Sequence, residues 1–442
     1  MGKDNEMKLH FASISGKRVE ASFDGGRLTS DGGVLHLRAM DKVLGLIDRL
    51  SRCISDSRHP SYVNHSLSDL MRQRIFQIAC GYEDANDCDS LRGDPAFKMA
   101  CDRLPITGDD LASQPTISRL ENKVRRSELY RLARTFVDVF LDSYKRAPKA
   151  IILDIDDTAD ETHGTQQLSL FNGFHEAYCY MPLHIYEGQS GKLITTILRP
   201  GSRPTGAQIV MIIKRLVAHI RARFPKVKII LRGDSHFSVP LVHDYCEEHG
   251  LYYVLGQAGN ARLNALGASL LRQAKVLAKQ KDTKVRLFGS FSYQAKSWKT
   301  PRRIIFKAEV TQYGPNPRFV VTNLESSQPS FIYERVYCPR GKMEGDIKNH
   351  KTVLHSDRTS CHRFQANQFR LFLHSAAYVL LHSLVNVGLK ETKWVHVPFD
   401  TIQKRLLKVG ARIKELATKI KVQFPSAFPL KDIYQRLDAT LG

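Results

Sequence analysis

Three acidic residues stand in settings that suit metal-assisted chemistry on phosphate esters. Asp156 and Asp234 each end an apolar run, residues 151–156 and 227–234, and Glu344 lies in a stretch with helical spacing. Two magnesium ions about 3.5–4 Å apart can stabilise both the attacking and the leaving oxygen of a phosphoryl transfer. Because Mg²⁺ keeps waters and substrate phosphates among its ligands, three carboxylates can suffice. The sequence therefore predicts a two-metal site in which Asp156, Asp234 and Glu344 are the ligands and catalytic residues.

The first metal ligand is open between Asp154 and Asp156. Side chains alternate along a strand, so both carboxylates point to the same side, and Asp156 lies where the strand becomes a loop. Such a carboxylate is costly to bury unless it pairs or binds a metal. On strand context alone, a turn or helix cap at residues 156–158 is an equally good interpretation, and Asp234 could cap the helix that begins near Val239.

The residues around Glu344 predict a helix with one polar face. At spacings of four, four and three, this face carries a carboxylate flanked by cations that suit phosphates, and a neighbouring apolar stripe can dock on a sheet. The polar stripe is Arg340, Glu344, Lys348 and Lys351, and the apolar stripe is Met343, Ile347 and Leu354. The alternative is a row of surface salt bridges, which would contribute little to stability.

The composition favours a polyanionic partner. The chain has 442 residues, enough for two or three domains, with 66 Lys and Arg against 44 Asp and Glu, a formal charge of +22. Its eight cysteines include no Cys-x-x-Cys pair, which argues against a zinc or thioredoxin-type site and indicates free thiols in a reducing cytoplasm. The longest apolar run, residues 376–381, stops at His382, so no membrane span is expected.

The order of predicted elements indicates an α/β protein. Residues 1–147 form a mostly helical region expected to bind DNA. Residues 113–119 resemble the opening of a recognition helix, in which Arg119 would contact DNA, although an ordinary capped helix is the alternative.

A strand at 150–156, a hairpin at 177–200, a helix at 206–224 and further strand–helix alternation to residue 255 follow the order of a ribonuclease-H-like sheet. We therefore expect the catalytic core at 148–256, a β-rich insertion at 257–330, the Glu-bearing helix of the core at 331–360 and a helical C-terminal region at 361–442. The C-terminal region includes a basic helix at 401–421 that could contact DNA or simply be solvated.

The spacing Tyr337-x2-Arg340-x3-Glu344-x6-Lys351 is similar to the Y-R-E-K signature of cut-and-paste DDE transposases of bacterial insertion sequences. Residues 26–33, 153–158, 163–166, 232–235 and 356–364 further resemble insertion-sequence family 1380. The resemblance covers nearly the whole chain.

The resemblance implies a role for each matching residue. Asp156, Asp234 and Glu344 would hold two Mg²⁺ ions, for which Mn²⁺ could substitute. Tyr337, Arg340 and Lys351 would bind phosphates of the transposon end, and Lys348 lies on the same predicted face. Trp298, within the expected insertion, would stack on a flipped base; the alternative is a buried packing residue.

The implied activity is metal-dependent cleavage and strand transfer at the terminal inverted repeats of the element. The expected partners are double-stranded DNA and a second copy of the chain in a synaptic complex, in the bacterial cytoplasm at the nucleoid, with no membrane. One alternative is a catalytically silent or domesticated DNA-binding protein, acting as a repressor or end-binder. Another is a structure-selective nuclease of the same fold that never joins strands.

Overall fold

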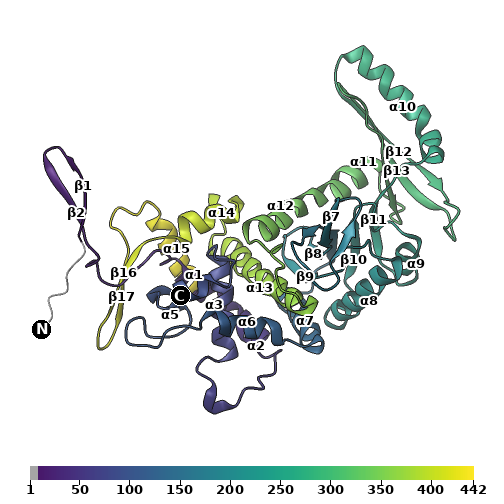
Figure 1. The fold of residues 1–442 in the computed structure, drawn as a ribbon. Coiled ribbons are helices and arrows are strands. Elements are labelled where there is room, and N and C mark those ends of the chain that lie inside the picture. The colour runs from purple at the N-terminus through teal and green to yellow at the C-terminus, as the bar shows by residue number, and fades with distance from the viewer. Residues whose placement is uncertain (1–7) are drawn as a thin grey trace, which may run out of the picture. The chain divides into compact units, whose positions relative to one another are not determined.

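A computed structural model describes residues 8–442 (Figure 1). The chain forms two compact units, one from residues 1–121 with 376–442 and the other from residues 122–375. The second unit begins well before residue 148, where the sequence analysis placed the catalytic core. The reason is helix α7 (Arg126–Asp142), whose apolar face, including Val137 and Phe140, packs into the core around the sheet of the second unit.

The second unit is built on a nine-stranded mixed sheet. Its strands follow the order β12-β13-β15-β11-β10-β4-β8-β9, with β14 beside β13. The five strands at one end of this order are β4 (Ala150–Asp157), β8 (Leu183–Glu187), β9 (Leu193–Ile197), β10 (Lys228–Gly233) and β11 (Tyr252–Gln257), with β9 at the edge. Strands β8 and β9 form an antiparallel hairpin beside β4, shorter than the predicted 177–200, whereas β10 and β11 run parallel to β4. Parallel strands end at the same edge, so the chain places the ends of β4 and β10 side by side.

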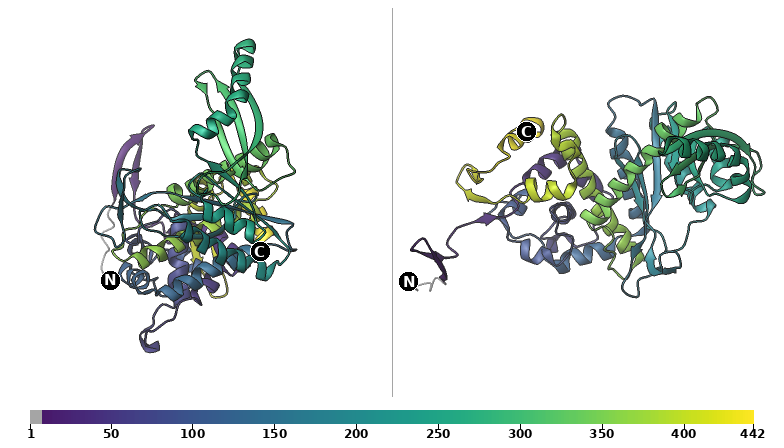
Figure 2. Two further views of the ribbon diagram at one scale, coloured as in Figure 1. Left: turned by 90° about the vertical axis from the view of Figure 1, so that its right-hand side faces the viewer. Right: turned by 90° about the horizontal axis from the view of Figure 1, so that it is seen from above.

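Helices cover both faces of this sheet (Figures 1 and 2). On one face, α7, α8 (Gly206–Arg223), α9 (Pro240–Glu248) and α10 (Ala261–Lys281) share a core with Ile151, Leu153 and Ile155, which are at most 2% exposed. Each such buried aliphatic side chain contributes about 1.5–3 kcal/mol.

On the other face lies a helical run of changing pitch. It comprises α11 (Pro329–Phe331), a π-helical segment (Ile332–Tyr337), a 3-10 turn (Cys338–Gly341), α12 (Lys342–Lys348) and a second π-helical segment (Asn349–Val353). Of its predicted apolar stripe, Met343 and Leu354 are buried and Ile347 is half-buried. Helix α13 (Phe364–Ser383) follows, and its Leu371 packs with Tyr180 and Leu198.

The expected β-rich insertion is part of the main sheet. Strands β12 (Val285–Tyr293), β13 (Arg302–Thr311), β14 (Gly314–Pro315) and β15 (Arg318–Thr322) extend it through the pairing of β15 with β11. The segment before them is the 21-residue helix α10, which the sequence analysis did not assign. It lies along β12 and β13 (Figure 1), and Gly267 is required there because a Cβ would lie 2.6 Å from the Phe306 ring.

A smaller three-stranded sheet completes the second unit. Strands β5 (Asp160–Glu161), β6 (Leu170–Asn172) and β7 (Ala177–Tyr180) pair in the order β5-β7-β6. The segment follows β4 directly in the chain, so it begins at the same sheet edge at which Asp156 lies.

The first unit is mostly helical, as predicted. Its elements are β1 (Leu9–Ile14), β2 (Lys17–Ala21), β3 (Leu28–Thr29), α1 (Val34–Leu44), α2 (Leu46–Ser51), α3 (Leu67–Ala79), α4 (Asp87–Leu91), α5 (Pro95–Ala100), most of α6 (Gln114–Lys123), α14 (Phe399–Ile402), β16 (Ala411–Glu415), β17 (Ile420–Gln423) and α15 (Lys431–Leu441). The turn at Gly32 and Gly33 donates backbone hydrogen bonds to Val409 and Leu407. A Cβ on Gly33 would overlap the Leu406 carbonyl, which explains the paired glycines.

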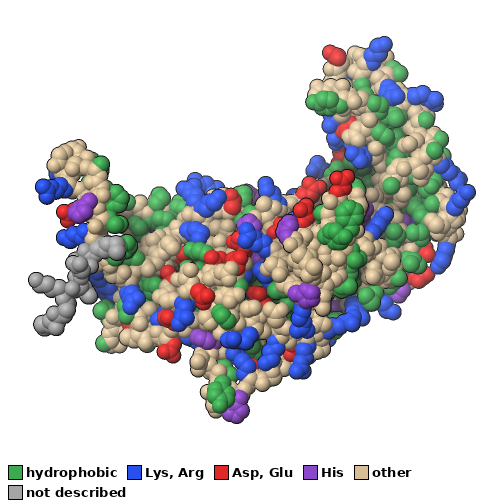
Figure 3. Space-filling view, viewed as in Figure 1, with side chains coloured by type: hydrophobic (Ala, Val, Ile, Leu, Met, Phe, Trp, Pro, Cys, Tyr) green, Lys and Arg blue, Asp and Glu red, His purple; other side chains and the backbone are tan. Residues whose placement is uncertain are grey.

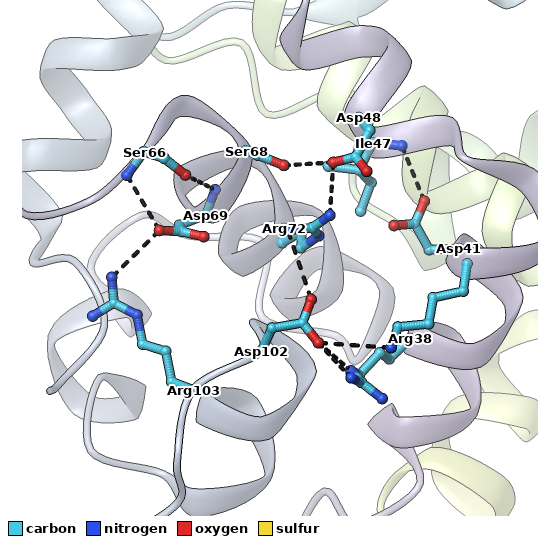
Figure 4. Close-up of polar contacts among 11 residues, drawn as sticks. Arg38, Asp41, Ile47, Asp48, Ser66, Ser68, Asp69, Arg72, Asp102 and Arg103 are labelled. Carbon is cyan, nitrogen blue, oxygen red and sulfur yellow. Dashed lines mark hydrogen bonds and ion pairs between the residues drawn. The ribbon is translucent and has the colours of Figure 1, made fainter. Parts of the chain in front are cut away.

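Polar contacts join the helices of this unit (Figure 4). Asp48 of α2 accepts hydrogen bonds from Ser68 and Arg72 of α3, at 2.7 and 2.6 Å. Arg38 of α1 pairs with Asp102, which follows α5. Burial raises the pKa of Asp41 to about 6. The hydrogen bond that its carboxylate accepts from the Ile47 amide acts in the opposite direction and lowers this pKa. Helices α1, α2 and α3 are thus held by charge pairs as well as by their apolar core.

The predicted basic helix at 401–421 is wrong. The helix ends by Leu407, and residues 411–423 form the antiparallel hairpin of β16 and β17, with β16 also pairing with β3. Gly410 precedes the hairpin, and burial then alternates: Ala411 and Ile413 are buried, whereas Arg412 and Lys414 are exposed. A period of two is the pattern of a strand with one buried face.

Among the described residues, the segment Phe364–Gly388 is long and apolar enough to cross a membrane. Within its most apolar window, 83% of the residues are buried inside the protein. That burial is what a core helix of a folded domain shows.

Candidate active site

Asp156 and Asp234 meet at the carboxyl edge of the sheet. Ile155 of β4 is in register with Gly233 of β10, so the two aspartates follow at neighbouring positions. Burial raises the pKa of Asp156 to about 7; Arg340 opposes this shift, and the charges of Asp234 and Asp157 add to it. Two carboxylates in so small a volume favour a cation between them.

Arg340 is the cation that lies among these acids. Its Nη1 is 3.0 Å from Asp156 Oδ2 and its Nη2 is 3.9 Å from Glu344 Oε1. Burial alone would lower the pKa of Arg340, but Asp156, Tyr337, Asp234 and Glu344 together raise it. Asp156 and Arg340 are 18% and 17% exposed, whereas Glu344 is 70% exposed on α12. The Y-R-E-K segment and the two strand-end aspartates therefore meet at one point of the fold.

The donor chemistry fits a hard divalent cation, but the three carboxylates are not yet gathered around one position. In residues 8–442, no group of three or more His, Cys, Asp or Glu side chains is close enough to hold an ion. Carboxylate oxygens are the ligands that Mg²⁺ prefers. Glu344 is exposed, and Arg340 is the cation that lies between it and Asp156.

Asp154 has a structural partner, which separates it from Asp156. Its two carboxylate oxygens each lie 2.5 Å from the Arg232 guanidinium, and both residues are 1% exposed. Arg232 also donates to the carbonyls of Val336, at 2.6 Å, and Gly188, at 3.2 Å. The pair therefore ties β4 and β10 to the segment that carries Tyr337. Asp156, at the mouth of the strand, is outside this pair and contacts Arg340 instead.

Asp234 is bound to its own turn and does not cap α9. Its Oδ1 accepts a hydrogen bond from the His236 amide at 2.9 Å, whereas the N-cap of α9 is Val239, which makes no side-chain cap. The helix-cap interpretation of Asp234 is therefore wrong.

Tyr337 lies directly beside Asp234. A Cβ built on Gly256 would be 2.7 Å from the Tyr337 hydroxyl, 3.0 Å from the Ser235 amide and 3.2 Å from the Asp234 carbonyl carbon. Burial raises the pKa of Tyr337, while Arg340 opposes this shift and Asp234 adds to it. Gly256, at the end of β11, thus makes room for a hydroxyl at the acid cluster, and the sequence analysis did not single it out.

Lys351 and Lys348 leave the helical run in different settings. Lys351 Nζ lies 3.5 Å from Asp160 Oδ1 and 3.2 Å from Thr158 Oγ1, and it also donates to the Ala159 carbonyl. Burial raises the pKa of Asp160 to about 7, although Lys351 opposes the shift. Lys348 is exposed. Lys351 of the predicted stripe thus contacts the loop after β4, whereas Lys348 faces solvent.

Asp157, Arg199 and His236 border the site, and the sequence did not indicate the contacts among them. Asp157 is paired with Arg199 at 3.3 Å and lies 3.4 Å from His236 Nδ1. Arg199 comes from the segment after β9, 42 residues from Asp157 in sequence, so no local pattern could indicate this contact. The pair holds the β9 end of the sheet against the strand that carries Asp156.

Two predicted DNA contacts lie elsewhere. Trp298 is 6% exposed and packs edge-on against His243 and Tyr293, with Arg302 over its ring at 5.2 Å. It is the buried packing residue that was the alternative, so the structure does not support base stacking there. Arg119 is exposed on α6, in the other unit, and donates to Thr116 Oγ1 at 3.0 Å.

Comparison with protein families now decides the class of this chain. Residues 11–442 match the family model described as transposase DDE domain group 1. The chain belongs to the DDE transposase family. A search of curated proteins finds no match. A solved structure described as the Mos1 transposase paired-end complex with left transposon end is 14% identical, covers 45% of this chain and 70% of that chain, and has a TM-score of 0.18.

As a member of this family, the chain is an enzyme of DNA transposition. Its candidate site acids, Asp156, Asp234 and Glu344, lie on a mixed α/β fold. Divalent metals are the usual cofactors of DDE transposases, and the carboxylates at this sheet edge have the chemistry to bind them. The missing side chain of Gly256 allows the Tyr337 hydroxyl to lie close to the backbone of Asp234.

Substituting Gly256 by Ala should lower the rate of DNA cleavage by this transposase by about 10²-fold, since misplacing a site group by roughly 1 Å can cost that much. The added methyl group has to displace the Tyr337 hydroxyl or the backbone beside Asp234. Single-turnover cleavage measures the effect. Gly345→Ala is the matched control, because nothing lies within 4 Å of its Cβ. Equal rates for both variants would show that the Tyr337 position is unimportant.

Proposed function

We propose that this chain is a cut-and-paste transposase similar to insertion-sequence family 1380, which binds the terminal inverted repeats of its own element and cleaves and joins DNA strands there. The observation that carries the proposal is Arg340, whose guanidinium lies among Asp156, Asp234 and Glu344. A ribonuclease-H-like core is the matching fold proposal. It is supported by the strand order β9-β8-β4-β10-β11, in which β10 and β11 run parallel to β4.

In this proposal, Asp156, Asp234 and Glu344 hold two Mg²⁺ ions, and Mn²⁺ can substitute. Bound ions would supply charge stabilisation at the attacking and leaving oxygens of each strand cleavage or transfer. The raised pKa of Asp156 supports the assignment, because a buried carboxylate beside another acid gains most from a neighbouring cation. Asp154 has no part in this set, since Arg232 occupies both of its oxygens.

The basic residues of the helical run are proposed to bind the transposon end. Arg340 can exchange its contact with Asp156 for a DNA phosphate, because a guanidinium suits both anions. Tyr337 offers a hydroxyl beside Asp234, Lys348 is exposed on α12, and Lys351 stands over the loop after β4. Together they would hold one phosphate backbone across the acid cluster.

Double-stranded DNA is the proposed partner, and two copies of the chain are proposed to hold two ends. The net charge of +22 supports a polyanion, and Lys and Arg side chains are spread widely over the face drawn in Figure 3. Arg119 on α6 is proposed as a contact of the end sequence; charge reversal there should weaken end binding.

Cleavage of a labelled duplex that carries the element's own terminal repeat tests this function in Mg²⁺. Wild type should cut at the repeat boundary, and Asp156→Ala, Asp234→Ala and Glu344→Ala should each lose on the order of 10³-fold in rate, the size of effect that losing a group stabilising transition-state charge has. Glu248→Ala, which removes an exposed carboxylate at the end of α9, is the control and should cut normally.

Wild type that binds the repeat without cutting it would favour the silent end-binder. Cutting without any joined product in the presence of target DNA would favour the nuclease alternative.

A further inference from the structure

A row of large apolar side chains is exposed on the small sheet that follows β4. Leu168 is 53% exposed, Leu170 42%, Phe171 58%, Phe174 83% and Tyr178 60%. These five residues, called the hairpin surface below, lie before and on the hairpin of β6 and β7. Contiguous exposed apolar groups of this kind mark a surface that another molecule covers.

The hairpin surface is held in place by contacts within its own unit. Phe171 is directly opposite Tyr178 in the register of β6 and β7, with ring centroids 5.5 Å apart. Asn172 donates to the Gly201 carbonyl at 2.8 Å and accepts from the Phe174 amide at 3.0 Å, which fixes the turn. The aromatic side chains are therefore exposed on a well-formed hairpin, with Phe174 in its turn.

Backbone strain lies at both ends of this segment. Leu168 has φ +63° and Glu176 has φ +54°, conformations that side chains with a Cβ rarely adopt. Such strain persists where the surrounding structure enforces it and is concentrated at functional surfaces.

DNA is a poor occupant for this surface. Residues 158–182 contain no Lys or Arg, although the whole chain has 66, and their exposed charges are Glu161 and Glu176, since Asp160 is buried beside Lys351. A phosphate backbone is bound chiefly through Lys and Arg. An apolar hairpin with only acidic charges fits instead an apolar protein surface bordered by cations.

The same unit contains such a surface. A cavity of about 750 Å³ lies between α7, α8 and the start of α13, with Leu129, Tyr130, Met211, Ile212 and Phe372 among its apolar lining. Exposed arginines border it, namely Arg126, Arg134, Arg215 and Arg363. Its volume is within the range of about 300–1,000 Å³ typical of pockets that bury a ligand of several rings.

Of the five residues of the hairpin surface, only Leu168 lines the cavity of its own chain, so the aromatic side chains of the hairpin do not fill it. Gln167 and Leu168 form part of the cavity wall, whereas Phe174 at the tip of the hairpin is 83% exposed. Reciprocal docking of two copies would cover both surfaces, since a two-fold axis pairs the hairpin of each chain with the cavity of the other.

We propose that two copies of this chain pair through this exchange, with the aromatic tip of each hairpin in the arginine-bordered cavity of its partner and Glu176 facing the arginines. This inference rests on the proposed function, in which two copies of the chain act together in one transposition reaction. The contact itself involves neither the acid cluster nor DNA.

Sedimentation velocity of the full chain, without DNA or metal, tests this pairing over a concentration series. Wild type should sediment as a dimer. The double variant Phe171→Ser with Phe174→Ser, and separately Met211→Glu in the cavity, should each raise the dimer dissociation constant at least tenfold. Both changes are at exposed side chains, and thermal melting confirms that the variants fold. Tyr313→Ser, 91% exposed in another turn, is the control and should sediment as wild type.

Mixing the two variants gives the sharpest result. Each alone has no intact contact, but a mixed dimer retains one, between the intact hairpin of the Met211→Glu chain and the intact cavity of the other. Partial recovery of the dimer supports the exchange. A monomeric wild type, undisturbed dimers in either variant, or no recovery on mixing would overturn it. Loss of DNA binding by the hairpin variant with normal sedimentation would also overturn it, in favour of a DNA surface. A failure of the cleavage test would leave these outcomes unchanged.

Discussion

Asp154→Asn is expected to lower the free energy of unfolding by about 3–5 kcal/mol, because it leaves a buried arginine without its counter-charge. Arg232 is 1% exposed, and its guanidinium makes both of its carboxylate contacts to Asp154. Urea denaturation followed by circular dichroism measures the change. The loss should come with weaker docking of the Tyr337 segment, because Arg232 also holds the Val336 carbonyl.

Glu248→Gln is the control for this experiment. It changes the same kind of group on an exposed helix end and should alter stability by less than about 0.5 kcal/mol. If Asp154→Asn unfolds at the urea concentration of wild type and abolishes cleavage instead, Asp154 is the catalytic residue, and its assignment as a structural residue is wrong.

Asp156→Asn is expected to have the opposite effect on stability while it abolishes cleavage. Burial raises the pKa of Asp156 from 3.8 to about 7 in the folded protein, so between these values the folded state binds a proton that the unfolded state has lost. Stability therefore falls as pH rises through this window, and the full penalty applies above pH 7. A shift of three units corresponds to about 4 kcal/mol, an upper bound because Arg340 loses a partner in the variant.

Chemical denaturation in EDTA at pH 8 and at pH 4 measures this effect. The variant should be more stable than wild type by about 2 kcal/mol or more at pH 8, and this difference should nearly vanish at pH 4. A variant that is less stable than wild type at pH 8 would show that the Arg340 contact outweighs the burial of Asp156. Saturating Mg²⁺ should stabilise wild type and not the variant.

The sequence predicted the parts of the site that depend on local pattern. The aliphatic runs before Asp156 and Asp234 correctly indicated adjacent strands, because buried parallel strands are apolar on both faces. The spacing of Arg340 and Glu344 indicated one helical run, and the 3.9 Å contact between these two side chains follows from it. Strand β4 and helix α8 end within one residue of the predicted 156 and 224, whereas the predicted hairpin at 177–200 is shorter, because residues 177–180 form β7 of the small sheet.

Long-range partners could not be predicted in the same way. The choice between Asp154 and Asp156 depends on Arg232, seventy-eight positions from Asp154, and the only signal was an arginine inside an otherwise aliphatic strand. Trp298 is buried by aromatic neighbours from α9 and β12, which no local spacing indicates.

Two secondary-structure errors have local causes. Helix α10 has few buried positions, Leu263, Gly267 and Ala274, and its glycine weakens the helical pattern. At residues 401–421 the basic residues fit a helix as well as a strand. Gly410 and the alternation of apolar and basic residues after it, both present in the sequence, indicate a hairpin rather than a helix.

The most direct test of the account is to count the divalent ions bound at the acid cluster. Mn²⁺ binding to the complex of the full chain with its terminal-repeat duplex can be followed by the electron paramagnetic resonance signal of free Mn²⁺. Asp156→Ala, Asp234→Ala, Glu344→Ala and Glu248→Ala are compared on the same duplex, so that ions bound by DNA alone cancel. The account predicts two more ions per chain for wild type and Glu248→Ala than for Asp156→Ala or Asp234→Ala, and at least one more than for Glu344→Ala. Equal numbers of bound ions in all five proteins would contradict it.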